Sequence, residues 1–179
     1  MRIVNVYDAS SEGRYEEFNM LYDGNVNQIN VHTKLNLLQA VVAGDDNLEE
    51  RMKIAKYLIS NDVDINYVGG KYKRNCLHIL FANRRISNVD YLFSMTKILI
   101  ENNININFKD KFGAIPLHYL LGPNQYDIED LREIYMYLVT NKSDYQEKDN
   151  YGNSCMDYAT QFKREVFIEV VKEYKNGDK

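Results

Sequence analysis

The stretch DKFGAIPLHYLL, residues 110–121, is a glycine-containing turn that leads into a short apolar helix. The same pattern recurs along the chain. DNYGNSCMDYA (149–159) lies 39 positions later, RNCLHIL (74–80) lies 40 positions earlier, and NLLQAV (36–41) lies a further 39 positions before that. A sequence that repeats itself at a fixed period of this size predicts an array of structural repeats, in contrast to the single core of a globular enzyme.

Each period contains a second landmark, an apolar segment that ends in Asn or a similar polar residue. The clearest copy is 54–66, and its counterparts are 95–107 and 134–146. Leucines occupy the same position in all three copies: Leu58, Leu99 and Leu138. We expect these segments to be the second helix of each repeat, with the leucines buried.

These motifs resemble the ankyrin repeat. Its first helix carries Thr-Pro-Leu-His followed by Ala, and its second carries Leu-Leu before Gly-Ala-Asp-x-Asn. Residues 115–118 (Ile-Pro-Leu-His) and 75–78 (Asn-Cys-Leu-His) match the first pattern, and residues 61–66 match the second. The resemblance covers essentially the whole chain and implies an all-α solenoid of about five helix-turn-helix repeats. The usual ankyrin period is about 33 residues, so these repeats, of 39 or 40 residues, are elongated.

The pattern divides one domain, 1–179, into repeats whose approximate bounds are 1–30 (N-terminal cap), 31–68, 69–109, 110–148 and 149–174 (C-terminal cap), with a frayed tail at 175–179. The two helix anchors are 15 positions apart in each cap (Val6 to Leu21, Met156 to Val171), but 20, 22 and 21 positions apart in the inner repeats. We therefore predict that the extra residues form loops between the two helices, at 44–50, 83–90 and 122–130.

Composition places the chain among folded, water-soluble proteins, since 45% of its residues are hydrophobic and 27% are charged. The net charge of −4 argues against a general nucleic-acid-binding protein. No segment reaches the roughly 18 apolar residues of a membrane helix, and residues 1–8 are interrupted too early for a secretory signal. We expect a cytoplasmic protein that is monomeric when free and contacts neither membrane nor nucleic acid.

The histidines and cysteines invite a metal or redox interpretation, which the repeat spacing opposes. Equivalent positions of stacked helices lie about 8–10 Å apart, too far for His78 and His118 to ligate one zinc ion. The resemblance implies instead that each histidine bonds the backbone of the neighbouring turn, and we expect His32 to be exposed. Cys76 and Cys155 share one slot two repeats apart, about 20 Å, so we predict buried, reduced thiols.

No pattern in the chain indicates an enzyme. Residues 69–72 lack the spacing and the hydroxyl residue of a phosphate-binding loop and predict a plain turn. The acidic pairs at 45–46 and 49–50 predict a solvated loop, because nothing apolar surrounds them to raise a pKa. No nucleophile motif is present. We therefore expect no catalytic residues, no cofactor and no metal.

Three surfaces are candidates for binding another protein. The first is the row of turn tips, which carries an aromatic residue in each of three repeats: Lys71, Tyr72, Lys111, Phe112, Asn150 and Tyr151. Tyrosine is favoured at interfaces, although these aromatic residues would also serve to pack one turn on the next. The second is the concave face, with Phe81, Asn83, Tyr119 and Gln125. The third is the set of long loops, where Arg84 and Arg85 lie between two acidic loops.

The resemblance implies a protein–protein interaction module without catalytic activity. A small array with no appended domain suits a stoichiometric inhibitor, and the Asn-, Lys-, Ile- and Tyr-rich composition indicates an AT-rich coding source, bacterial or viral. One hypothesis is an immunity protein that neutralises a cognate toxin. The alternatives are a viral or bacterial effector or adaptor that binds host proteins, and a ligand- or nucleic-acid-binding protein.

Overall fold

The computed structural model describes residues 3–124, 126 and 129–177. Within these ranges the chain is all-helical, with ten α-helices, one short 3₁₀ helix and no strand. The elements in chain order are α1 (Val6–Ser11), α2 (Tyr15–Leu21), α3 (Leu37–Val42), α4 (Leu48–Ser60), α5 (Cys76–Ala82), α6 (Val89–Glu101), α7 (Pro116–Leu121), η1 (Glu129–Leu131), α8 (Arg132–Thr140), α9 (Cys155–Gln161) and α10 (Glu165–Gly177).

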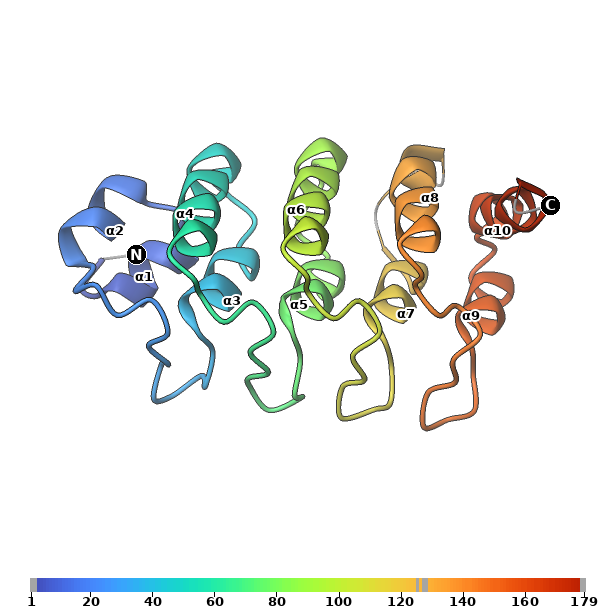
Figure 1. Cartoon of the computed structure of the whole chain (residues 1–179), viewed down its shortest axis with the longest axis horizontal. Helices are drawn as coiled ribbons and strands as arrows, with labels where there is room; N and C mark the ends of the chain where they lie inside the picture. The colour runs from blue at the N-terminus through green and yellow to red at the C-terminus, as the bar shows by residue number, and fades with distance from the viewer. Residues whose placement is uncertain (1–2, 125, 127–128, 178–179) are drawn as a thin grey trace.

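The helices form two layers in one elongated row (Figure 1). The first layer contains α1, α3, α5, α7 and α9, each packed on the next, and the second contains α2, α4, α6, α8 and α10 in the same order. Between successive helix pairs the chain leaves the second layer, makes a hairpin-like excursion below the first layer, and returns to begin the next pair. No helix in the described ranges is long and apolar enough to cross a membrane.

Polar side chains cap three of the first-layer helices that follow the hairpins. The carboxamide oxygens of Asn36 and Asn75 accept the backbone N–H three residues later, at 2.8 and 3.2 Å, and the Ser154 hydroxyl does the same at 3.2 Å. These contacts satisfy amide groups that a helix N-terminus otherwise leaves unpaired. The remaining helix of this group, α7, begins with Pro116 and has no such cap. The first position of a helix suits proline, because the N–H that proline lacks would have no helical partner there.

The hairpins turn through a residue with positive φ, and these residues recur with the period of the sequence. They are Lys34 (φ 59°), Lys73 (56°), Gly113 (72°) and Gly152 (82°). Successive tips are joined by backbone hydrogen bonds. The N–H groups of Gly70, Lys111 and Asn150 donate to carbonyls of the preceding hairpin at 3.2, 2.9 and 2.9 Å. The four hairpins therefore form one connected row.

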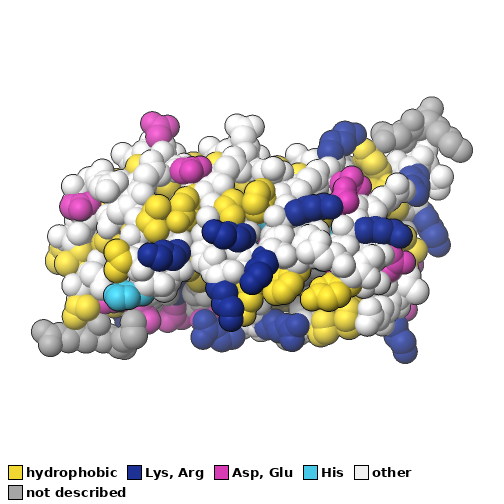
Figure 2. All heavy atoms as spheres, turned by 90° about the horizontal axis from the view of Figure 1, so that it is seen from below, with side chains coloured by type: hydrophobic (Ala, Val, Ile, Leu, Met, Phe, Trp, Pro, Cys, Tyr) yellow, Lys and Arg dark blue, Asp and Glu magenta, His cyan; other side chains and the backbone are white. Residues whose placement is uncertain are grey.

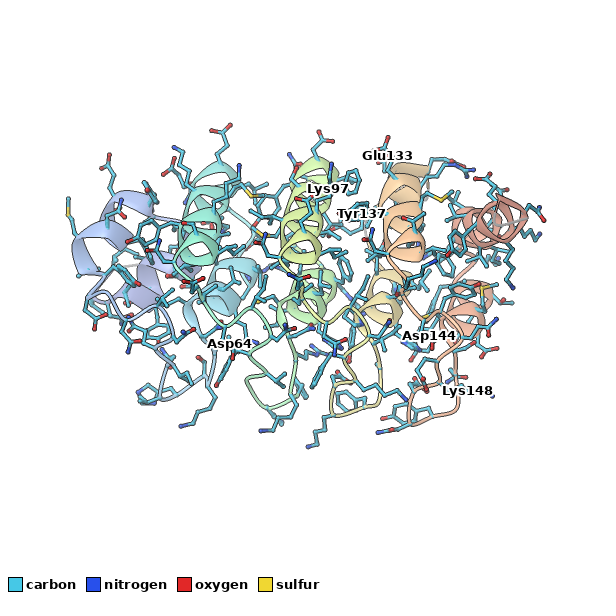
Figure 3. All side chains as sticks on the ribbon, in the orientation of Figure 1. Asp64, Lys97, Glu133, Tyr137, Asp144 and Lys148 are labelled. Atoms are coloured by element: carbon cyan, nitrogen blue, oxygen red, sulfur yellow. The ribbon has the colours of Figure 1, made fainter. Side chains whose placement is uncertain are left out.

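A ladder of asparagines connects each helix pair to the next. The Asn66 side chain donates to the carbonyl of Asn103 (3.0 Å) and accepts from the N–H of Asn105 (2.7 Å). Asn27 makes the equivalent pair of bonds one unit earlier, and Asn107 makes it one unit later. In Figure 3 the labelled Asp64 and Asp144, whose N–H groups take part, lie where the second-layer helices lead into the hairpins. Each asparagine side chain bonds only backbone groups of the next unit, so these contacts do not depend on which side chains that unit carries there.

The core runs along the whole row, and its second-layer anchors Leu58, Leu99 and Leu138 are fully buried as predicted. The predicted anchor of the N-terminal unit is wrong, because Leu21 is 40% exposed and Phe18 is fully buried. Phe18 stacks on Tyr22 with ring centroids 5.2 Å apart. The α2 helix begins at Tyr15, so its one inward-facing position falls three residues before Leu21. At the other end Met156 is half-buried, and its neighbour Cys155 is the buried residue.

The connections within the elongated units are shorter than predicted, because the second-layer helices start earlier. Helices α4 and α6 begin at Leu48 and Val89, which leaves 43–47 and 83–88 as loops. Acidic residues favour the first turn of a helix, so Glu49 and Glu50 belong to α4 and were misinterpreted as loop. Part of the predicted third loop, residues 125 and 127–128, lies outside the described residues. The predicted frayed tail is also wrong for 175–177, which continue α10.

Candidate protein-interaction face

The hairpins at 28–36, 66–75, 107–116 and 146–154 lie side by side along one long side of the molecule, and we call this side the tip face (Figure 1). Figure 2 looks onto it from below. Lys and Arg side chains spread over its middle, with hydrophobic side chains between them. In Figure 3 the labelled Lys148 lies on the last hairpin.

The structure brings the predicted tip residues together. Tyr72 is 41% exposed and Tyr151 is 72% exposed, whereas Phe112 is half-buried. The rings of Tyr72 and Phe112 contact each other with centroids 5.6 Å apart. Packing of one tip on the next and display to solvent therefore coexist in this pair. Lys71, Lys111 and Asn150 are exposed beside them, and the Asn150 carboxamide also donates to the Lys111 carbonyl (3.2 Å).

Of the predicted concave-face residues that the structure describes, only Tyr119 lies at the surface with a side chain that a ligand can reach. Phe81 is buried with 4% exposure, so the prediction that it contacts a partner is wrong: α5 turns this ring into the core. Asn83 is half-buried and donates to the carbonyls of Ala43 (3.0 Å) and Gly44 (3.2 Å), which makes it part of the scaffold. Tyr119 is half-buried at the surface, and Gln125 lies outside the described residues.

A pocket of about 330 Å³ lies between the second to fourth hairpins and the C-terminal ends of α5, α7 and α9. Five aromatic side chains line it, together with two arginines: Phe112, Tyr119, Tyr151, Tyr158, Phe162, Arg74 and Arg84. We call it the tip pocket. Two of the predicted tip residues and one predicted concave-face residue therefore belong to the same cavity.

The walls of the tip pocket are held by buried carboxylates. Asp110 accepts the Tyr119 hydroxyl at 2.6 Å and the Arg74 guanidinium at 3.3 Å. One unit later Asp149 accepts the Tyr158 hydroxyl at 3.0 Å. Burial, and secondly the bond to its aspartate, raises the pKa of each tyrosine to about 12. Both phenols stay protonated near neutral pH, and with their hydroxyl groups engaged they offer mainly their rings to a ligand.

The two arginines of the pocket differ in their partners. The Arg74 guanidinium lies over the rings of Tyr72 and Tyr119, 5.0 and 4.2 Å from the centroids, and is paired with Asp110. Arg84 is exposed and forms no ion pair with any described residue. Its neighbour Arg85 pairs with Asp45 at 3.4 Å and does not line the pocket.

The histidines take the role that the resemblance implies. His78 Nε2 lies 2.9 Å from the Ala114 carbonyl, and His118 Nε2 lies 3.2 Å from the Asn153 carbonyl, each in the following hairpin. Burial lowers the pKa of His78 to about 4 and lowers that of His118, so both rings are neutral at pH 7. In the preceding unit Gln39 fills the same slot and donates to the carbonyls of Tyr67 (3.0 Å) and Arg74 (2.8 Å). His32 is exposed, as predicted.

The remaining reactive groups are enclosed in the scaffold. Cys76 and Cys155 are buried free thiols, as predicted, and burial raises both pKa values. Among the described residues no group of three His, Cys, Asp or Glu side chains is placed to hold a metal ion. Gly69 and Gly70 form a hairpin, in which the N–H groups of Gly69 and Arg74 each donate to the other's carbonyl, at 3.2 and 3.1 Å. This confirms the predicted turn.

Sequence reasoning missed the separation of charge. The four hairpins contain seven Lys or Arg and three Asp or Glu, a net charge of +4 in a chain whose total is −4, so the remainder carries −8. The opposite, second-layer side has an acidic hollow of about 540 Å³ between α6 and α8, rimmed by Asp90, Glu129, Asp130 and Glu133. Figure 3 shows Glu133 on this layer, with Lys97 and Tyr137. Counting charge by segment would have found this asymmetry.

Comparison with known proteins adds no family: no protein-family model matches the chain, and no curated protein is significantly similar to it.

Proposed function

We propose that this chain is an ankyrin-type solenoid that binds another protein through its tip face and catalyses no reaction. The observation that carries the proposal is the connected row of tips. Backbone hydrogen bonds between successive hairpins hold exposed Tyr72 and Tyr151, with Phe112 between them, on one side of the molecule. A surface that is rigid before binding loses less conformational entropy in a complex.

The ankyrin assignment is supported by the period of 39 or 40 residues, by the alternation of helix pairs and hairpins, and by the bonds of His78 and His118 to the next hairpin. Five helix pairs correspond to the five repeats expected at 1–30, 31–68, 69–109, 110–148 and 149–174. The connection between the two helices is shorter in the end pairs (12–14 and 162–164) than in the inner pairs (43–47 and 83–88), and terminal repeats that differ from the inner ones are typical of caps.

A non-catalytic role is supported by the environment of the groups that could react. The two buried histidines are neutral and bonded to backbone, and both thiols are enclosed with raised pKa values. Within this proposal the protein acts in the cytoplasm as a monomer when free. It blocks its partner one-to-one, as an immunity protein would block a toxin.

Affinity capture with the tagged protein tests the proposal. The informative variant carries Tyr72→Ala, Phe112→Ala and Tyr151→Ala, and a matched control carries Met20→Ala, Lys56→Ala and Glu101→Ala at exposed second-layer positions. We expect one stoichiometric partner that the parent and the control retain and the tip variant loses. Circular dichroism must show that both variants are folded. Equal capture by all three proteins would place the binding surface elsewhere.

A further inference from the structure

We propose that the tip face recognises an acidic segment of the partner protein, and that one large apolar side chain of this segment enters the tip pocket. This inference rests on the proposed function and adds to it the chemistry of the partner. It combines two independent observations: hairpin lysines that have no ion-pair partner among the described residues, and the aromatic cavity beside these hairpins.

The positive charge of the tip face is available to a ligand because the local carboxylates are already engaged. Asp110 and Asp149 are buried, with 6% and 7% exposure, and each accepts several hydrogen bonds from its own hairpin and from a tyrosine. Glu147 pairs with Lys109 at 2.7 Å. Five exposed lysines on the hairpins form no ion pair with any described residue: Lys34, Lys71, Lys73, Lys111 and Lys148.

The lining of the tip pocket combines aromatic rings with two arginines and one buried aspartate, Asp149. Its interior is built from rings whose hydroxyl groups, at Tyr119 and Tyr158, are bonded to buried aspartates. Arg84 adds an exposed guanidinium at the same cavity, one that has no ion-pair partner among the described residues. A guanidinium group prefers a carboxylate, which it can bind through two parallel hydrogen bonds. The site therefore suits a ligand that places a large apolar group next to a carboxylate.

The distribution of charge favours an acidic protein segment over a nucleic acid. Outside the hairpins the molecule carries −8, so a long polyanion that extends beyond the tip face meets repulsion, whereas a short segment stays on it. The rings of Tyr72 and Phe112 contact each other, with their centroids 5.6 Å apart, and leave no space between them for a nucleic-acid base. Single-strand binding proteins instead present aromatic residues on which successive bases stack.

Fluorescence polarisation with synthetic probes tests this inference on the full chain. The main probe is a labelled short peptide of Glu and Asp with one central Phe. Comparison probes replace the Phe by Ala, replace the acids by Gln and Asn, or replace the peptide by oligothymidylate. We expect the acidic Phe peptide to bind most tightly, the Ala peptide about tenfold more weakly, and the affinity of both acidic peptides to fall with salt.

Two matched variants locate the site. Arg84→Gln removes the unpaired guanidinium of the pocket, and Arg85→Gln removes its exposed neighbour, which lies outside the pocket. Arg84 makes no ion pair with any residue that the structure describes, so an effect of its replacement on binding reports contact with the ligand. We expect Arg84→Gln to weaken the acidic Phe peptide about tenfold, the cost of one charged contact, and Arg85→Gln to leave it unchanged.

Several outcomes would overturn the inference. Equal binding of the neutral peptide would remove the role of charge, and tighter binding of oligothymidylate would identify a nucleic-acid surface. Absence of peptide binding at millimolar concentration would exclude this ligand chemistry. If the natural partner is lost by the aromatic triple variant and retained by Arg84→Gln, this inference fails while the proposed function stands.

Discussion

Replacing Arg51 by Met should destabilise the protein strongly, although this residue lies outside the tip face and the tip pocket. The Arg51 guanidinium is fully buried and lies where α1, α3 and α4 meet. It donates to the carbonyls of Ser10, Val41 and Asp46, at 3.3, 2.8 and 2.6 Å, and also to that of Ser11. These carbonyls include those of the last turns of α1 and α3, where a helix leaves backbone acceptors without its regular N–H partners. The Ser10 and Val41 carbonyls also accept long bonds from the N–H groups of Gly13 (3.3 Å) and Gly44 (3.4 Å).

Methionine fills most of the arginine volume but offers no donor, so the substitution isolates the hydrogen bonds. Removing one partner of a buried charged network costs about 3–5 kcal/mol, because four carbonyls lose a charged donor and only those of Ser10 and Val41 keep a backbone N–H. For a chain of this size we expect a fall in melting temperature of about 10 °C. The urea concentration at the unfolding midpoint should fall by about 1–2 M, if the free energy of unfolding decreases by about 2–3 kcal/mol per molar urea.

Two further variants separate the contributions. Asp46→Asn weakens only the ion pair with a carboxylate that is 58% exposed, and should cost less than about 1 kcal/mol. Gly44→Ala should resemble Arg51→Met, because a Cβ at this position would lie 1.9 Å from the guanidinium carbon. Urea unfolding followed by circular dichroism measures all three. If Arg51→Met unfolds at the parent midpoint, the carbonyl contacts contribute nothing and our account of this junction is wrong.

Three other changes test the scaffold by urea unfolding. Burial lowers the pKa of His78 to about 4, below its unfolded value of about 6.5, so the unfolded state binds the proton more tightly and stability falls as pH drops from 6.5 towards 4. At pH 5 the protonation of His78 in the unfolded state lowers the free energy of unfolding by about 2 kcal/mol. The His78→Gln variant should therefore lose less stability than the parent between pH 7.5 and 5, and an equal loss would exclude His78 as the cause. Asn66→Ala removes both bonds to the next unit and should cost about 1–2 kcal/mol, whereas Asn102→Ala, which loses only a bond within its helix region, should be nearly neutral. Gly113→Ala combines φ 72° with a Cβ only 2.4 Å from the Asn150 side chain and should cost about 2–3 kcal/mol, whereas Gly152→Ala has positive φ but open space and should cost about 1 kcal/mol; equal effects would show that the contact is irrelevant.

The order of turns and helices was predictable because each unit repeats the same local chemistry. A capping side chain, an apolar helix and a buried leucine recur at constant spacing, so independent copies support one another. The bonds of His78 and His118 to the next hairpin were predictable only through the resemblance. The repeat spacing opposes a zinc ion shared by the two histidines, but it does not say which group each ring binds instead.

Other features could not be deduced from local patterns. Lys34 and Lys73 occupy the positive-φ position that glycine fills in the later hairpins, so glycine alone did not locate the tips. The inward rotation of Phe81 depends on how α5 packs between its neighbours. The tip pocket depends on Arg84, which is distant in sequence from the aromatic residues it joins. Only the assembled row of helices brings these groups together.

The two buried cysteines can report local unfolding at two different places in the molecule. Cys76 begins α5 in the middle of the row, and Cys155 begins α9 in the last helix pair. Both thiols are enclosed, so an alkylating reagent reaches either one only during a local opening. In a row held by nearest-neighbour contacts, loss of structure starts most readily at an end. In the unmodified protein, the alkylation rate of Cys155 therefore measures how often the last helix pair unfolds locally, and the rate of Cys76 measures the same for the middle of the row.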